Sequence, residues 1–194
     1  MKLFKKLLII IFSIAIIATA SIYAIWHNEI ATVASIKTII NQDLSHDDGY
    51  TYEMYVSGDY YFEDFLKQGG ATNDAELIQF VTDHITKGLI PMTIKSKEIA
   101  CSSFTAWTED KKFVFGRNYD FDQTNTAIVH TSPKGRHASI STIDLQFLGI
   151  KEESGISSIK EKALLLAAPY IPLDGINDAG VACGIYMTYQ GEPT

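Results

Sequence analysis

The pattern of hydrophobic and polar positions divides the chain into an apolar leader, a middle part with helical periodicity and a final part of strands. Residues 1–26 begin with lysines and continue as a nearly unbroken apolar run. In residues 27–100 the apolar residues mostly recur at helical spacing. The elements predicted there are helices over 27–45, 60–66 and 73–87, a strand over 50–56 and an extended connector over 89–100. Asn73 and Glu76 have the spacing of a capping box.

From Cys101 onward the pattern changes to short apolar runs separated by turn residues. The predicted elements are strands over 101–108, 112–118, 127–131, 139–147 and 181–189, a helix over 159–168 and a turn over 174–177. Such strands must bury one face against another layer. We therefore predict an α+β protein in which 27–100 is a leader segment and 101–194 is the amino-terminal part of the main domain.

The leader has the features of an export signal. Lys2, Lys5 and Lys6 precede an apolar run from Leu7 to Trp26, and residues 18–20 form an A-x-A-like cleavage site. The run is also long enough to cross a bilayer as a helix. Two interpretations stay open: a cleaved signal peptide, or an anchor formed by residues 7–26. Both place the rest of the chain outside the cytoplasm, secreted or membrane-anchored.

Composition and charge exclude some partners. The 194 residues carry a net charge of −7, and the basic residues form no stripe. Binding to nucleic acid depends on lysine and arginine that neutralise phosphates, so we expect no nucleic-acid partner. The two cysteines, Cys101 and Cys183, lie in apolar, strand-like contexts. They are compatible with a disulfide or with free thiols, and we predict that Cys183 is a core residue.

The hairpin after the connector brings a cysteine and an arginine together. A loop of Glu109-Asp110 places Cys101 opposite Asn118, and a loop one residue longer places it opposite Arg117. Opposed residues are about 5 Å apart at Cβ. Arg117 is therefore predicted close to Cys101, where a guanidinium favours the thiolate. Asp120 follows at the end of the second strand.

A cysteine nucleophile also needs a base. His130 is the best candidate for a conventional Cys/His pair, but no Cys/His motif stands out among the five histidines. The other candidate is the α-amine of Cys101 itself, freed by cleavage after Ala100. An α-amine has a pKa of roughly 7.7–8.0, suitable for general base catalysis. The sequence lacks metal-ligand motifs, so we predict neither a metal nor a cofactor.

Three motifs together resemble the choloylglycine hydrolase family, which includes bile salt hydrolases and penicillin V acylases and is related to acid ceramidase and N-acylethanolamine amidase. The motifs are CSSFTA at 101–106, FGRNYDF at 115–121 and DGINDAG at 174–180. The resemblance covers roughly residues 101–189. It implies the αββα sandwich of N-terminal-nucleophile hydrolases and self-cleavage before the nucleophile.

The resemblance also implies roles for individual residues. Cys101 would attack a linear amide carbonyl, Arg117 would lie beside the sulfur, and Asp120 would hold the α-amine. Asn177 lies in the family's turn and is expected to shape the backbone. Met187 falls near the position of an oxyanion-hole group, where bile salt hydrolases commonly have asparagine and penicillin acylases tyrosine.

The expected function is hydrolysis of a small-molecule linear amide whose acyl part is an acyl chain or a steroid-like acid. Relatives carry a further active-site asparagine and arginine at positions beyond residue 194, so we expect a carboxy-terminal portion or a second chain to complete the site. The alternative is an inactive, membrane-tethered relative or fragment that binds acyl ligands or a partner chain.

Overall fold

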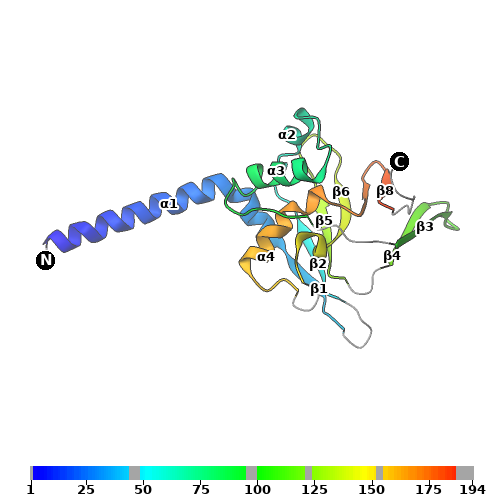
Figure 1. The fold of residues 1–194 in the computed structure, drawn as a ribbon, viewed down its shortest axis with the longest axis horizontal. Coiled ribbons are helices and arrows are strands. Elements are labelled where there is room, and N and C mark those ends of the chain that lie inside the picture. The colour runs from blue at the N-terminus through cyan, green and yellow to red at the C-terminus, as the bar shows by residue number, and fades with distance from the viewer. Residues whose placement is uncertain (1, 44–48, 95–99, 121–123, 152–154, 187–194) are drawn as a thin grey trace.

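The fold is a mixed α+β arrangement around one six-stranded sheet (Figure 1). The computed structural model describes residues 2–43, 49–94, 100–120, 124–151 and 155–186. The helices are α1 (Lys2–Ser35), α2 (Phe62–Lys67), α3 (Asp74–His84) and α4 (Ile159–Leu164), with 3-10 turns η1 (Leu145–Leu148) and η2 (Leu165–Tyr170). The strands are β1 (Lys37–Ile40), β2 (Thr51–Tyr55), β3 (Ala100–Trp107), β4 (Phe113–Asp120), β5 (Thr126–Thr131), β6 (Ser139–Asp144), β7 (Asp174–Asn177) and β8 (Ala182–Gly184).

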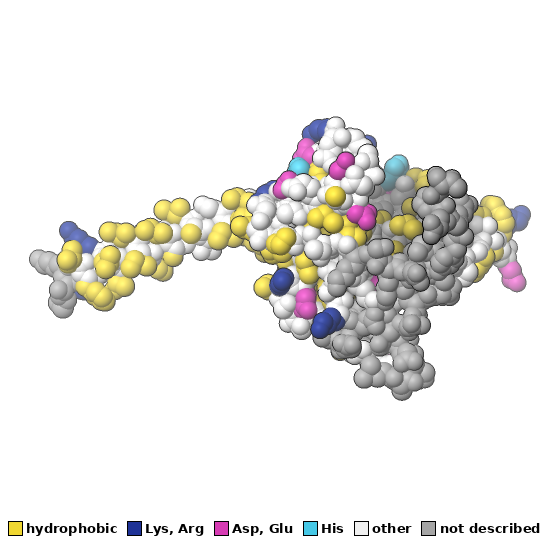
Figure 2. Space-filling view, in the orientation of Figure 1, with side chains coloured by type: hydrophobic (Ala, Val, Ile, Leu, Met, Phe, Trp, Pro, Cys, Tyr) yellow, Lys and Arg dark blue, Asp and Glu magenta, His cyan; other side chains and the backbone are white. Residues whose placement is uncertain are grey.

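Helix α1 is both the apolar leader and the first element of the folded domain. Its amino-terminal part projects away from the rest of the molecule, and hydrophobic side chains cover it (Figures 1 and 2). It is long and apolar enough to cross a membrane, a property that a signal sequence shares. The helix departs from helical geometry at Trp26, with φ −120° and ψ 24°, and then continues to Ser35 along the domain.

Hydrogen bonds fix the part of α1 after Trp26 to the domain. Thr32 is buried, and its hydroxyl accepts the Ser57 N–H at 2.9 Å. The Ser35 hydroxyl accepts the Tyr55 N–H at 2.8 Å. The prediction of one helix over 27–45 is wrong beyond Ser35, because β1 follows at Lys37–Ile40. The run of β-branched residues there favours a strand, and β1 pairs with β2.

The six-stranded sheet has the order β1-β2-β5-β6-β7-β8. Strands β2 and β5 are parallel, and the other neighbouring pairs are antiparallel. The predicted hairpin of β5 and β6 is confirmed. Because β2 belongs to the predicted leader segment and β5 follows Cys101, the two segments share one sheet. Cutting the chain between them would leave hydrogen-bonded partners on both sides of the cut.

The core lies between one face of this sheet and the helices. Buried residues from both segments form one cluster: Tyr52, Met54, Phe80, Val81, Ile85, Met92, Ala127, Val129, Ile143, Leu145, Leu148, Ile150, Leu165, Ala167 and Ala168. The helix predicted over 159–168 is present as α4 followed by η2. The side chain of Asn73 caps α3 by accepting the Glu76 N–H, but the Glu76 carboxylate accepts from Thr72 instead of completing the capping box.

Leu145→Ala is expected to destabilise the fold by about 2–5 kcal/mol, because the side chain is fully buried and its removal leaves a cavity. Urea unfolding of the full chain measures this change. The matched control is Leu66→Ala on α2, where the side chain is 44% exposed and a change within about 0.5 kcal/mol is expected. Equal losses of stability in the two variants would contradict the assigned core.

The end of the described chain differs from the prediction in two ways. Asp174–Asn177 is strand β7, so the predicted turn at 174–177 is wrong. The turn lies one step later, because the Asn177 side chain accepts the N–H groups of Ala179 and Val181 and Gly180 takes a φ of +80°. The strand predicted over 181–189 is described only as β8, Ala182–Gly184, and residues 187–189 lie outside the described residues.

Candidate active site

The β3–β4 hairpin forms a sheet of its own, on the side of the molecule opposite the projecting part of α1 and near β8 (Figure 1). Cys101 pairs with Tyr119, and Ser103 pairs with Arg117. Both predicted pairings of Cys101, with Asn118 and with Arg117, are therefore wrong. The reason is the loop: Thr108 bonds to Lys112 across residues 109–111, and Lys111 takes a φ of 61°.

The predicted proximity of Arg117 and Cys101 nevertheless holds. Residues two apart in a strand share a face, so Arg117 is the diagonal neighbour of Cys101 across the hairpin. Its Nη2 lies 3.3 Å from the Cys101 Sγ, within hydrogen-bonding distance for sulfur. Both cysteines are free thiols. Cys101 is half-buried, whereas Cys183 is exposed, which corrects its assignment to the core.

The guanidinium of Arg117 is enclosed by groups from β4, β7 and the segment after β8. Its side chain is only 3% exposed, and Nε lies 3.8 Å from the Asp174 carboxylate. Nη2 also donates to the Ile185 carbonyl. The rings of Tyr119 and Tyr186 each lie 4.6 Å from its central carbon. A buried cation with one carboxylate and two aromatic faces is held in place at a considerable desolvation cost.

A glycine makes room for this arginine. A Cβ built on Gly184 would lie 1.8 Å from Arg117 Nη1, far closer than non-bonded atoms approach. Any side chain at position 184 would therefore displace the guanidinium or β8. A substitution of Gly184 therefore shifts the guanidinium while Arg117 itself is kept.

Asp174 connects the arginine to the six-stranded sheet. Thr142 on β6 donates a hydrogen bond to its carboxylate at 2.6 Å. The Thr142 hydroxyl also lies 3.2 Å from the Tyr119 hydroxyl. Burial raises the pKa of Tyr119, so this phenol stays protonated. The hydrogen bonds that link Tyr119, Thr142 and Asp174 therefore connect the hairpin to β6 and β7.

Sequence reasoning missed the roles of Tyr119, Thr142 and Asp174. The DGIN motif contained Asp174, but only the pairing of β6 with β7 brings it near Arg117. Thr142 and Asp174 border a hollow of about 270 Å³ next to the cation. Its lining is Phe115, Arg117, Ile140, Ser141, Thr142, Asp174, Gly175 and Ile176. The hollow is apolar on the side of the isoleucines and charged at Arg117, a combination suited to a polar group on an apolar body.

Three other site residues were predicted: Asp120, Asn177 and Met187. The Asp120 backbone pairs with Ala100, next to the bond that self-cleavage would cut, and its side chain lies outside the description. Asn177 shapes the turn after β7, as expected. Met187 lies outside the described residues.

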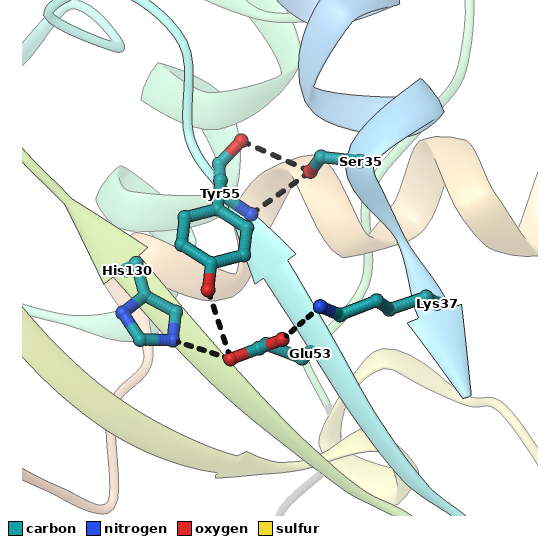
Figure 3. Close-up of polar contacts among 5 residues, drawn as sticks. All are labelled: Ser35, Lys37, Glu53, Tyr55 and His130. Atoms are coloured by element: carbon teal, nitrogen blue, oxygen red, sulfur yellow. Dashed lines mark hydrogen bonds and ion pairs between the residues drawn. The ribbon is translucent and has the colours of Figure 1, made fainter. Parts of the chain in front are cut away.

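His130 belongs to a different cluster on the six-stranded sheet. Its Nε2 lies 3.1 Å from the Glu53 carboxylate, and its ring stacks on Tyr55 at 4.3 Å (Figure 3). Tyr55 and Lys37 also bond to Glu53, at 3.0 and 2.6 Å. The structure thus gives His130 a carboxylate partner in this cluster instead of bringing it together with Cys101.

The same cluster predicts a dependence of stability on acid. The hydrogen bond from Lys37 is the largest cause that lowers the pKa of Glu53 from its ordinary value of 4.5. A lowered pKa in the folded state contributes stability above pH 4.5, and that contribution is lost as the pH falls through the folded-state pKa. Glu53→Gln should therefore flatten the acid limb of the stability curve below pH 4.5, measured by urea unfolding at several pH values. Glu109→Gln in the exposed hairpin loop is the control, and an unchanged acid limb in Glu53→Gln would contradict the assignment.

Comparisons of the chain with protein-family models, with curated proteins and with solved structures found no match. Within the residues that the structure describes, no group of three or more His, Cys, Asp or Glu side chains is placed to hold a metal ion.

Proposed function

We propose that the chain belongs to an exported or membrane-anchored cysteine amidase that hydrolyses a linear amide with Cys101 as an N-terminal nucleophile. The contact of Arg117 Nη2 with the Cys101 sulfur, at 3.3 Å, carries this proposal. A cation that is 3% exposed is costly to keep unless a negative partner is present. Asp174 is one such partner, and the sulfur anion that forms when the α-amine takes the Cys101 proton would be a second.

The proposed reaction begins with hydrolysis of the peptide bond between Ala100 and Cys101 by water, which leaves a carboxylate on Ala100 and frees the α-amine of Cys101. This amine takes the thiol proton, the sulfur attacks the amide carbonyl carbon, and the amine returns the proton to the departing nitrogen as the C–N bond breaks. Water then hydrolyses the thioester to the free acid and the thiol. Arg117 stabilises the sulfur anion, and Asp120 is proposed to orient the α-amine.

We propose that the specific architecture is an αββα sandwich, in which β3 and β4 begin the second sheet. The outer face of the six-stranded sheet supports this sandwich, because Ile140 and Ile176 are 45% and 48% exposed there. A second sheet packed on this face would bury them. Arg117 and Tyr119 already reach this face through Asp174 and Thr142. Further strands beside the hairpin would cover the remaining apolar surface.

Exposed aromatic side chains on the β3–β4 hairpin favour a second candidate function, an inactive membrane-tethered protein that binds acyl ligands or a partner chain. On the hairpin, Phe104, Trp107 and Phe113 are 63%, 71% and 56% exposed. An exposed aromatic surface of this kind is typical of an interaction site. In this alternative Arg117 and Cys101 would have only a structural role.

A thiol-labelling experiment separates the two functions. The purified full chain is treated with an acyl β-lactone, which acylates activated cysteine nucleophiles, and the modified peptide is identified by mass spectrometry. The amidase proposal predicts modification of half-buried Cys101 ahead of exposed Cys183. Modification that follows exposure, with Cys183 labelled first, would favour the binding function. Release of acid and amine from a panel of N-acyl amides then identifies the substrate.

A further inference from the structure

An apolar groove lies where α1 joins the domain, at the end of the molecule away from the hairpin. It has a volume of about 730 Å³, and its walls come from α1, the end of α3 and the segment after it, α4 and η2. Ile22, Trp26 and Ile30 line it from α1. Leu89 and Ile159 line it from the domain, and these side chains are 72% and 82% exposed.

The length of α1 sets the height of this groove relative to a membrane. An α-helix rises about 1.5 Å per residue, so the apolar run from Leu7 to Trp26 spans about 30 Å, the thickness of the hydrocarbon layer. With Lys5 and Lys6 at one surface, Trp26 falls at the other, where tryptophan is enriched. The groove begins at Ile22 and Trp26, and so opens at the boundary between acyl chains and headgroups.

Hydrogen bonds join the groove to the part of α1 that begins at Trp26. The Trp26 indole donates to the Ile85 carbonyl at 3.2 Å, which joins the helix to the end of α3. One turn further, the Tyr61 hydroxyl donates to Glu29 at 2.7 Å. On the membrane side of Trp26, Ile22 lines the groove, and a rotation of the domain about the non-helical Trp26 would remove Ile22 from it. With Ile22 and Trp26 both in the groove wall, exposed Leu89 and Ile159 lie near the membrane surface that α1 reaches.

We propose that this groove is a membrane-contact surface that takes up acyl chains of the surrounding lipid. The inference rests on the membrane anchorage in the proposed function but is independent of the chemistry at Cys101. The lining includes Ile22, Trp26 and Ile30 of the apolar helix α1. Figure 2 shows hydrophobic side chains on α1 and on the domain near their junction. Lys162 borders the groove, where its amine can reach anionic headgroups while its methylenes remain in the apolar layer.

Site-specific fluorescence tests this proposal on the full chain in vesicles of phosphatidylcholine and phosphatidylglycerol. Cys101 and Cys183 are replaced by serine, and an environment-sensitive NBD label is attached to a single new cysteine in Ile159→Cys. Spin-labelled lipids with the nitroxide near the headgroup serve as quenchers. The anchor control is Ile22→Cys, and the control on the sheet face is Ile176→Cys, which is 48% exposed.

The proposal predicts strong quenching at positions 22 and 159 and little at 176. Quenching at 22 alone would show that α1 is inserted while the groove faces water, which overturns the inference but leaves the anchorage intact. Blue-shifted emission at 159 indicates an apolar environment for the label. If lipid quenchers do not reduce this emission, protein covers the groove, and this result also overturns the inference. Absence of quenching at 22 would overturn the anchorage and the groove proposal together.

Discussion

Cys101→Ala is expected to abolish both cleavage of the chain and amide hydrolysis, with turnover reduced more than about a thousandfold. The substitution removes the sulfur that forms the thioester, and no other described thiol shares its contact with Arg117. Cleavage is followed by mass spectrometry, and turnover by release of the amine. The hairpin is largely exposed to solvent, so loss of one thiol should leave the fold intact, which circular dichroism verifies.

Cys183→Ala is the matched control for this experiment. Cys183 is an exposed thiol on β8, paired with Gly175 of β7. Because it has no assigned chemistry, its replacement should leave cleavage and turnover unchanged. Retained processing in Cys101→Ala, or loss of processing in Cys183→Ala, would contradict the assignment of the nucleophile.

Arg117→Ala is expected to lower kcat/KM by about a hundredfold, the usual loss when a preorganised electrostatic group is removed from an active site. The guanidinium is 3% exposed, so its charge acts on the Cys101 sulfur with little screening by water. Arg117→Lys keeps the charge but loses the planar group between Tyr119 and Tyr186, and we expect an intermediate loss. The alkylation rate of Cys101 should fall in parallel with activity.

Two further variants separate electrostatics from a general effect on structure. Arg136→Ala removes an arginine that is 46% exposed and bonded to Glu63, and it should retain full activity. Gly184→Ala keeps Arg117 but places a Cβ where Nη1 lies, so it should reduce activity by displacing the cation. Activity of Arg117→Ala equal to that of Arg136→Ala would contradict a role for Arg117 at the sulfur.

The sequence carried enough information to predict local structure and the short-range part of the candidate site. Hairpin spacing alone brought Arg117 close to Cys101. The observed register differs by two residues from the predicted pairing of Cys101 with Arg117, and a shift of two residues keeps both side chains on one face. Hairpin spacing did not give the register, which depends on the three-residue loop and on Lys111 at positive φ. The turn assigned to 174–177 failed because Asn177 and Gly180 form the turn one step later.

The long-range part of the candidate site could not be predicted from local patterns. Asp174 approaches Arg117 only because β7 pairs with β6, and Gly184 matters only because β8 then passes the guanidinium. The predicted boundary after residue 26 coincides with the non-helical Trp26, where two helical stretches of α1 meet. Local patterns could not predict the contacts of Thr32 and Ser35, which hold the second stretch of the helix on β2 and the segment after it.

The N-terminal sequence and intact mass of the protein after export test the central claim most directly. The denatured sample must be measured, because β2 and β5 pair across the cut and would keep the two pieces together in the native state. The account predicts a polypeptide that begins at Cys101 and is absent from Cys101→Ala. A chain that still contains the bond between Ala100 and Cys101 while hydrolysing an amide would contradict catalysis by the α-amine of Cys101.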